Sequence, residues 1–296
     1  MAESRHVTDV LIFGSTGLFG QALVSAAAAR GLSVTGAARH GADATVDISD
    51  DASVGDVIDR VRPAVVINAA AIIDIGQCQQ EPERAWAINA RAPGVIAEHA
   101  ARTGARPIYI STDHYFSGDG DRRHSETDPV CFLNEYARTK FAGEAMVMAQ
   151  AEGLVVRTNI LGFRGWTKPT FTEWALDIIL KDRPVTLFDD SFVSSIDVDH
   201  AAQSIFDLAD HGAQGLFNIG SRDVYSKKRL IEELASRLGR RLTQARTGSV
   251  SELPVRRAES LGLDVSKAES LLGYPMPDLP EVLDAIIEAG AQRNAI

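Results

Sequence analysis

Short, continuous runs of apolar residues recur along the first half of the chain, separated by segments with helical spacing. Residues 10–13 are apolar throughout, and further short strands are predicted at 33–37, 64–68, 108–111 and 154–157. An unbroken apolar run is typical of a strand that is buried on both faces of a parallel sheet, because a half-exposed strand would alternate with polar residues. The pattern therefore predicts an α/β fold, a doubly wound parallel sheet of the Rossmann type.

Helices are expected between and after these runs. Their predicted ranges are 21–30, 81–103, 136–152, 171–180, 199–208, 227–238, 266–272 and 279–290, with one more strand at 216–219. No linker rich in Gly and Ser divides the chain, so we expect one Rossmann core with a smaller C-terminal substrate lobe assembled from later segments. Residues 1–165 form the predicted core, to which 196–219 return, and 166–195 with 220–296 form the lobe.

Three glycines follow the first apolar run at intervals of three residues, and an alanine-rich helical segment comes after them. Gly14, Gly17 and Gly20 therefore stand in a turn between a strand and a helix. Such a turn lets the backbone approach a pyrophosphate closely and ends at helix N–H groups that attract anions. A tight turn without a ligand is the alternative for a lone triplet, but a place on the first strand favours a dinucleotide site. The predicted contacts are Gly14, Ser15, Thr16, Gly17, Leu18, Phe19 and Gly20.

The end of the second predicted strand bears on which dinucleotide binds. A site for NAD usually has Asp or Glu there for the ribose 2′-OH, whereas Arg suits the 2′-phosphate of NADP. The strand end lacks an acidic residue and carries Arg39, so the sequence predicts NADP(H), with a solvated surface arginine as the alternative. Asp47 is a candidate adenine contact that could instead cap a turn. The remaining predicted cofactor contacts are Ile48, Asn68, Ala69 and Ala70.

A tyrosine and a lysine four residues apart, Tyr136 and Lys140, begin the helix that follows the fourth apolar run. Residues at i and i+4 project from one face of a helix. A nearby ammonium would lower the pKa of the tyrosine from about 10 toward the working pH, so that it can protonate the alkoxide left by hydride transfer. Thr112, just past the preceding strand, would hold the substrate oxygen. An amphipathic surface helix is the alternative for a lone Y-x-x-x-K, but the glycine turn upstream favours carbonyl reduction.

Composition and charge argue against several other classes of protein. The formal net charge of −10 disfavours nucleic acid or an anionic membrane as partner, although a local site for a small anion is compatible with it. No apolar stretch approaches the roughly 20 residues that span a bilayer, and the first residues lack the apolar core of a signal peptide. Two distant cysteines, Cys78 and Cys131, fit a reduced, cytoplasmic setting. The seven histidines form no H-E-x-x-H or H-x-H pair, so no metal site is predicted.

Taken together, these motifs resemble an extended short-chain dehydrogenase/reductase over nearly the whole chain. The motifs are G-x-x-G-x-x-G at 14–20, N-A-A at 68–70, S-T-D at 111–113 and Y-x-x-x-K at 136–140. More narrowly, the stretches 111–118, 136–144 and 156–158 resemble the dTDP-4-dehydrorhamnose reductase branch. That resemblance implies NADP(H)-dependent reduction of a 4-keto group on a nucleotide-linked deoxysugar, with Thr112, Tyr136 and Lys140 as the catalytic set.

Departures from the branch lie next to the expected substrate. The branch commonly has Tyr where His114 stands, and an aromatic residue where Asn159 stands. In related sugar-nucleotide enzymes an Asn at this second point faces the diphosphate. We therefore expect Asp113, His114 and Asn159 to face the substrate. Arg222, Arg256 and Arg257 are candidates for pairing with a diphosphate.

Other functions stay open on the sequence. Sugar-nucleotide 4,6-dehydratases are similar in fold but need a Glu after Thr-Asp, where this chain has His114, and an imidazole can also act as a base. Epimerases usually show a Ser and small residues in place of Thr112-Asp113. The non-catalytic alternative resembles the regulatory subunit of methionine adenosyltransferase, which binds NADP without a known need for turnover. Helices 81–103 and 136–152 could pair with their copies in a homodimer.

Overall fold

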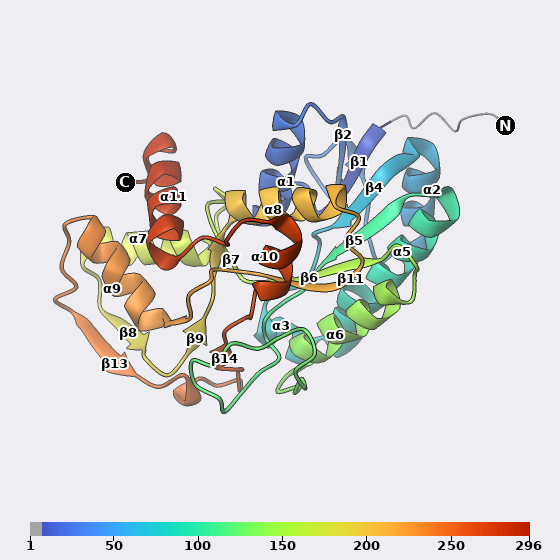
Figure 1. Ribbon diagram of the computed structural model, residues 1–296. Coiled ribbons are helices and arrows are strands. Elements are labelled where there is room, and N and C mark those ends of the chain that lie inside the picture. The colour runs from blue at the N-terminus through green and yellow to red at the C-terminus, as the bar shows by residue number, and fades with distance from the viewer. Residues whose placement is uncertain (1–7) are drawn as a thin grey trace. The chain divides into compact units, whose positions relative to one another are not determined.

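The computed structural model describes residues 8–296 and groups the chain into two compact units (Figure 1). Unit 1 contains the described residues up to Thr112, together with Asn134–Arg157 and Ala202–Phe217. Unit 2 contains Asp113–Leu133, Thr158–Ala201 and Asn218–Ile296. The predicted core had also included 113–133 and 158–165, which the structure groups with unit 2. The assignment of a cofactor to the core and a substrate to the lobe stays a prediction.

A seven-stranded sheet forms the centre of unit 1, in the order β11-β6-β5-β4-β1-β2-β3. The strands are β1 (Thr8–Phe13), β2 (Val34–Ala38), β3 (Ala44–Thr45), β4 (Pro63–Asn68), β5 (Arg106–Ile110), β6 (Leu154–Thr158) and β11 (Gly215–Ile219). From β3 to β6 every neighbouring pair is parallel. Residues 10–13 of β1 are at most 1% exposed, because the strand lies between β2 and β4 and is covered on both faces. The predicted α/β fold with a Rossmann-type parallel sheet is confirmed.

Helices cover both faces of this sheet. On one face α2 (Asp51–Val61) and α5 (Ala92–Thr103) bury Val54, Ile58 and Ile96 against Leu11 and Val66 of the strands. Figure 1 shows α1 (Leu18–Ala29) and α8 (Val198–Asp210) on the other side. Two ion pairs join these helices, from Arg30 at the end of α1 to Asp207 and Asp210 of α8. Of the segment 196–219 that was expected to return to the core, the structure groups Ala202–Phe217 with unit 1.

The predicted long helix 81–103 is interrupted by one wider turn. It consists of α4 (Pro82–Trp86), a π-helical turn (Ala87–Arg91) and α5. Asn89 lies in the π-helical turn, where its side chain accepts from Ile72 N and donates to Ile72 O, both at 2.9 Å. The turn thus fastens the segment after β4, and π-turns of this kind are frequent at functional sites. Two further helices complete unit 1: α3 (Ile75–Gln80) and α6 (Glu135–Met148).

Unit 2 contains three small sheets and four helices that lie wholly within it. The sheets pair β7 (Ile160–Leu161) with β10 (Ile196–Asp197), β8 (Val185–Phe188) with β13 (Ala245–Gly248), and β12 (Tyr225–Ser226) and β14 (Ser260–Leu261) with β9 (Phe192–Val193). The helices are α7 (Phe171–Lys181), α9 (Lys227–Arg237), α10 (Ser266–Leu272) and α11 (Leu279–Gln292), with a 3-10 turn at Val250–Glu252. These helices match their predicted ranges within two residues, whereas the small strands were not predicted.

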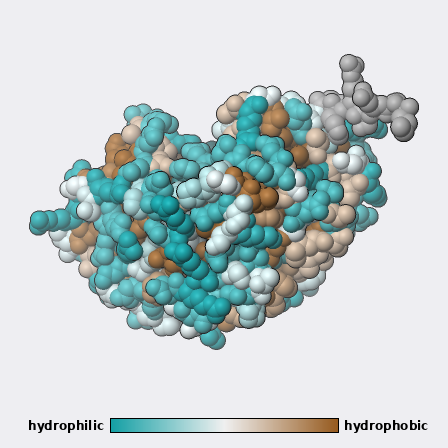
Figure 2. Space-filling model, in the orientation of Figure 1, coloured by the Kyte–Doolittle hydropathy of each residue, from teal (hydrophilic) through white to brown (hydrophobic). Residues whose placement is uncertain are grey.

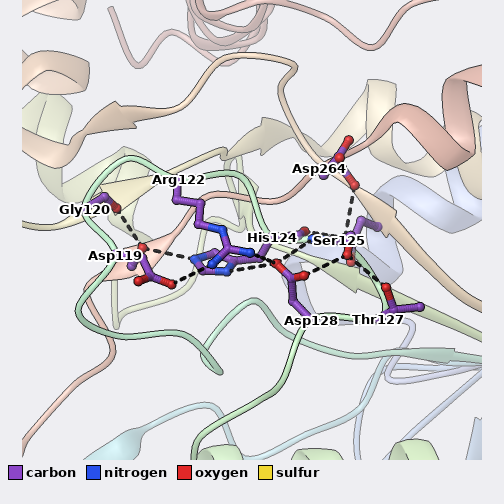
Figure 3. A network of polar contacts seen from close by, with 10 residues as sticks. Asp119, Gly120, Arg122, His124, Ser125, Thr127, Asp128 and Asp264 are labelled. Carbon is purple, nitrogen blue, oxygen red and sulfur yellow. Dashed lines mark hydrogen bonds and ion pairs between the residues drawn. The ribbon is translucent and has the colours of Figure 1, made fainter.

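A polar network holds the segment 113–133 within unit 2 (Figure 3). At its centre is the buried ring of His124, which stacks on Phe116 with ring centroids 4.0 Å apart. His124 Nε2 lies 3.1 Å from Ser260 Oγ on β14, and Nδ1 lies 3.5 Å from Asp128 Oδ2. Arg122 donates to the same carboxylate at 3.0 Å. The segment is therefore fastened to β14, which explains why it groups with unit 2.

The described surface is mixed in character. Figure 2 shows hydrophobic residues scattered among hydrophilic ones on the visible face. Large apolar side chains that are more than a third exposed include Ile73, Trp86, Trp166 and Trp174. Within residues 8–296, none of the helices has the length and apolarity needed to cross a membrane.

Candidate active site

The glycine-rich turn of unit 1 has the tight geometry that the three-residue spacing predicts. Gly14 has a φ of +80°, and a Cβ built on it would lie 2.8 Å from Ala70 N. A Cβ on Gly20 would lie only 2.0 Å from Gly14 O. Gly17 caps α1 and has no side chain that could accept from the N–H groups of the first turn. A side chain at Gly14 or Gly20 would collide with this backbone, so both glycines are needed for a tight backbone cradle of the kind that binds a pyrophosphate before a helix.

The segment after β4 lies against this turn. Ala69 N donates to Phe13 O at 3.0 Å, and Ala70 N donates to Asn68 Oδ1 at 3.1 Å. Asn68 is 2% exposed, and its Nδ2 has no hydrogen-bond partner among the described residues. A buried donor of this kind is costly unless a ligand or water accepts from it. The structure thus places 68–70 beside the glycine turn, and their contact with a nucleotide stays a prediction.

The residues predicted around the adenine take different positions. Ile48 is buried, whereas Arg39 is exposed. Asp47 Oδ1 accepts from Ser49 N at 2.9 Å and from Ser49 Oγ at 2.7 Å, so its carboxylate holds the turn before α2, the alternative that the sequence left open. These hydrogen bonds lower the pKa of Asp47, and the positive charge of Arg39 adds to the effect. Arg39 therefore lies within electrostatic range of Asp47.

The three predicted catalytic residues all belong to unit 1 and are all buried. Thr112 follows the carboxyl end of β5 and is 3% exposed, while Tyr136 and Lys140 on the first turns of α6 are 7% and 2% exposed. Asn134 caps this helix by accepting from Ala137 N at 3.0 Å, which fixes where the helix begins and so the direction of both side chains. A surface helix, the alternative for the Y-x-x-x-K motif, is wrong for this chain.

Lys140 is held at the edge of the sheet by contacts to β5. Its Nζ donates to Ile110 O at 2.7 Å and lies 4.1 Å from the centre of the Tyr109 ring. Burial lowers the pKa of Lys140 to about 7, against the raising effect of the Glu144 carboxylate. The ammonium is therefore bound to Ile110, two residues before Thr112 in the chain. Its charge changes near neutral pH.

A buried ion pair that the motifs do not include lies behind Lys140. Arg157 at the end of β6 donates from Nε and Nη2 to Glu144 at 3.0 and 2.7 Å, and Ser111 Oγ donates to the same carboxylate at 2.6 Å. Arg157 and Glu144 are 2% and 0% exposed. Sequence reasoning missed this pair. A signal was present, because Glu144 continues the i, i+4 series of Tyr136 and Lys140 on one helix face.

The predicted substrate residues Asp113 and Asn159 meet in unit 2. Asn159 Nδ2 donates to Asp113 Oδ2 at 2.7 Å, and Asn159 Oδ1 accepts from Ser195 Oγ at 3.0 Å. Asp113 is 1% exposed, so its carboxylate depends on such donors for stabilisation. Tyr225 holds Ser195 in place, because its hydroxyl donates to Ser195 O at 2.6 Å. Asn159 is thus a connector between Asp113 and Ser195, and its predicted contact with a diphosphate stays a prediction.

His114 is the third predicted substrate residue. Its side chain is 17% exposed, with Nε2 3.9 Å from Asp113 Oδ1. Burial lowers the pKa of His114 to about 3, and the positive charges of Lys227 and Arg257 act in the same direction. The imidazole is therefore neutral at physiological pH, able to donate or accept a hydrogen bond but a weak base.

The arginines suggested for a diphosphate are not brought to one place by the described contacts. Arg222 donates to Asp278 Oδ2 at 2.8 Å and so is engaged with the cap of α11. Arg257 is exposed and lies within electrostatic range of His114. Arg256 lies within electrostatic range of Cys131. Among residues 8–296 no group of His, Cys, Asp and Glu could hold a metal ion.

Comparison with known proteins points to one family. The model of the family described as RmlD substrate binding domain matches residues 8–291. A Haloferax volcanii protein named "Probable low-salt glycan biosynthesis reductase Agl14" is 29% identical over 288 residues, covering 93% of this chain and 96% of that protein. The dTDP-4-dehydrorhamnose reductase of Escherichia coli K12 is 28% identical over 288 residues, covering 91% and 94%.

A solved structure gives the same fold. The dTDP-4-dehydrorhamnose reductase of Bacillus anthracis, determined in complex with NADP, superposes with a TM-score of 0.85. The match covers 95% of this chain and 99% of that chain at 22% identity, so it bears on the fold alone.

Proposed function

Because the chain belongs to the RmlD substrate binding domain family of sugar-nucleotide reductases, we propose that it reduces a keto group on a nucleotide-linked deoxysugar with NADPH. The keto group is at C4, and Tyr136 is the proton donor. Membership makes the chain an oxidoreductase of the short-chain dehydrogenase/reductase type. The identity of the sugar, the position of the ketone and the preference for NADPH belong to the proposal.

The observation that carries this proposal is the buried arrangement of Tyr136 and Lys140 beside β5. Lys140 Nζ donates to Ile110 O, and the chain reaches Thr112 two residues later. A tyrosine and a lysine on a solvated helix face would lack a fixed geometry, whereas these two side chains are at most 7% exposed. Preorganised donors in a dry site stabilise a developing charge far better than donors in water.

The chemistry assigns one role to each residue. Thr112 donates a hydrogen bond to the ketone oxygen and fixes its position. When bound, NADPH supplies the hydride. Tyr136 gives its phenolic proton to the oxygen that becomes the alcohol, and the Lys140 ammonium stabilises the phenolate that remains. Water then returns the proton to Tyr136.

The glycine cradle supports the cofactor part of the proposal. Gly14 and Gly20 allow the tight turn that leads into the start of α1, where a pyrophosphate can bind, and Asn68 Nδ2 is a buried donor without a protein acceptor in the described chain. Arg39 is exposed at the end of β2, where it can pair with a 2′-phosphate. These residues therefore fit a nicotinamide dinucleotide.

His114 supports reduction over dehydration. A dehydratase needs a base after Thr112-Asp113 to remove a proton from carbon. An imidazole whose pKa is lowered to about 3 is a weak base for that step. A reductase requires no such base, and a neutral His114 suits a hydrogen bond to a sugar hydroxyl.

The test is a reduction assay with a matched pair of tyrosine variants. The protein is given a dTDP-4-keto-6-deoxysugar and NADPH, and nicotinamide absorbance is followed. Wild type and Tyr274→Phe, which alters an exposed tyrosine, should consume NADPH at the same rate. Tyr136→Phe should bind NADPH and consume it about 10²-fold more slowly.

Two results would contradict the proposal. Tight NADPH binding without NADPH consumption across several nucleotide-linked ketosugars would favour the non-catalytic alternative, in which the protein binds NADP as a regulatory subunit. Release of water from a nucleotide-linked hexose without net NADPH consumption would favour dehydration.

A further inference from the structure

The connection between β2 and β3, residues 39–43, brings an acidic side chain back to the middle of β2. Asp43 Oδ2 accepts from Gly36 N at 2.8 Å. A Cβ built on Gly36 would lie 2.7 Å from Ser15 Oγ and 3.4 Å from Asp43 Oδ2. The Asp43 carboxylate and the Ser15 hydroxyl therefore lie over the same point of the strand, although 28 positions separate them in the sequence.

The same connection folds over the glycine-rich turn. Gly41 has a φ of +68°, and a Cβ built on it would lie 3.9 Å from Thr16 Cγ2. Ser15 N and Gly14 N both point at Ala37 O, at 3.4 and 2.8 Å, so the turn and the end of β2 form one surface. Asp43 stands at the edge of that surface and is exposed.

We propose that Asp43 is a specificity-determining residue of the cofactor site, which accepts from the ribose 2′-OH of NADH and repels the 2′-phosphate of NADPH. The inference rests on the proposed function, in which the glycine-rich turn holds a nicotinamide dinucleotide. Arg39, on the same connection, acts in the opposite direction. The chain therefore uses both cofactors, with a preference set by the balance between Asp43 and Arg39.

The contacts of Asp43 leave it free for this role. Oδ2 is engaged by Gly36 N, and within residues 8–296 Oδ1 accepts no hydrogen bond and pairs with no cation. A carboxylate with one oxygen fixed by the backbone is oriented, and its second oxygen is available to a hydroxyl donor. A phosphate at the same place would add about 1.5 to 2 negative charges next to that of Asp43.

The substitution that isolates the charge is Asp43→Asn. Asparagine keeps an oxygen that can accept from Gly36 N, so this backbone N–H keeps its partner while the negative charge is removed. The dissociation constants of NADH and NADPH are measured separately by nicotinamide fluorescence. The preference for NADPH over NADH should increase about fivefold, as expected for two unit charges about 4 Å apart in a medium as polar as water, since Asp43 is exposed.

Three further variants make the result specific. Asp59→Asn removes the same charge from an exposed position on α2, and it should leave the ratio of the two constants unchanged. Arg39→Ala should shift the ratio toward NADH. Asp43→Ala removes the same charge and should reproduce the shift of Asp43→Asn.

The outcomes separate this inference from the function on which it rests. If wild type binds both cofactors and neither Asp43 variant changes the ratio, the role of Asp43 is overturned and the proposed function stands. If wild type binds neither cofactor, the cofactor part of the proposed function fails and the inference fails with it. A shift of equal size in Asp59→Asn would show a general charge effect and also overturn the role of Asp43.

Discussion

Burial of His114 predicts a loss of stability in mild acid that one substitution should remove. The folded imidazole has a pKa of about 3, lowered first by burial and then by Lys227 and Arg257, whereas an unfolded histidine titrates near 6.5. Below pH 6.5 the unfolded chain therefore binds a proton that the folded chain does not bind. The contribution of His114 to the free energy of unfolding is thus fully present above pH 6.5, and it decreases as the pH falls from 6.5 toward 3.

The magnitude follows from the size of this window. Each pH unit below 6.5 changes the free energy of unfolding by about 1.4 kcal/mol, because one proton is taken up by the unfolded state alone. At pH 5 the loss due to His114 is therefore about 2 kcal/mol relative to pH 7. This is a large share of the roughly 5–15 kcal/mol that stabilises a typical protein.

The assay compares urea unfolding at pH 7 and pH 5 for wild type, His114→Gln and His40→Gln. Glutamine fills a similar volume without titrating, so His114→Gln should lose about 2 kcal/mol less than wild type between the two pH values. His40→Gln changes an exposed imidazole and should lose as much as wild type. Burial also lowers the pKa of His124, but His124 is present in all three proteins, so its contribution cancels.

An equal loss in wild type and His114→Gln would refute the reasoning. It would mean that His114 binds a proton in the folded protein, because the attraction of the neighbouring Asp113 carboxylate outweighs the effect of burial on the pKa of His114. In that case the argument against a base at this position, which favours reduction over dehydration, would lose its support.

Three further predictions concern the catalytic face of α6. Tyr136→Phe should retain NADPH affinity by fluorescence titration while kcat falls about 10²-fold, and an unchanged kcat would remove the tyrosine from the mechanism. Because the pKa of Lys140 is lowered to about 7, kcat should fall as the pH rises through 7, and a profile flat to pH 9 would show that its charge is not needed. Glu144→Gln leaves the Arg157 charge buried alone, so urea unfolding should show a loss of about 3 kcal/mol, against little change for the exposed Glu98→Gln.

The sheet and the glycine turn could be predicted because local sequence dictates them. A strand such as β1, covered on both faces, must be apolar at every position, and this leaves an unbroken run. The turn requires Gly14, Gly17 and Gly20 in fixed order, since each alternative side chain meets backbone. Helix α9 was predicted within one residue because Ser226 caps it, accepting from Arg229 N at 3.1 Å.

The features that sequence reasoning missed arise from contacts between distant segments. Most strands of unit 2 have two residues, too few for any periodicity to appear. Asp43 follows a glycine-containing connection and looks like a loop residue, and it matters only because the chain turns back to Gly36. The end of β2 carries no acidic residue along the chain, and Asp43 reaches the middle of that strand only through the fold.

The buried network behind Lys140 suggests why the Y-x-x-x-K motif works only in the right surroundings. Burial alone would remove the charge of Lys140, because an isolated ammonium is unstable away from water. The Glu144 carboxylate, one helical turn further along, raises the pKa against that effect. Arg157 and Ser111 hold this carboxylate in place, so it stays within reach of Lys140 without pairing with it. In the proposed mechanism, the positive charge beside Tyr136 is therefore supported by residues outside the motif, and the motif by itself would not predict a catalyst.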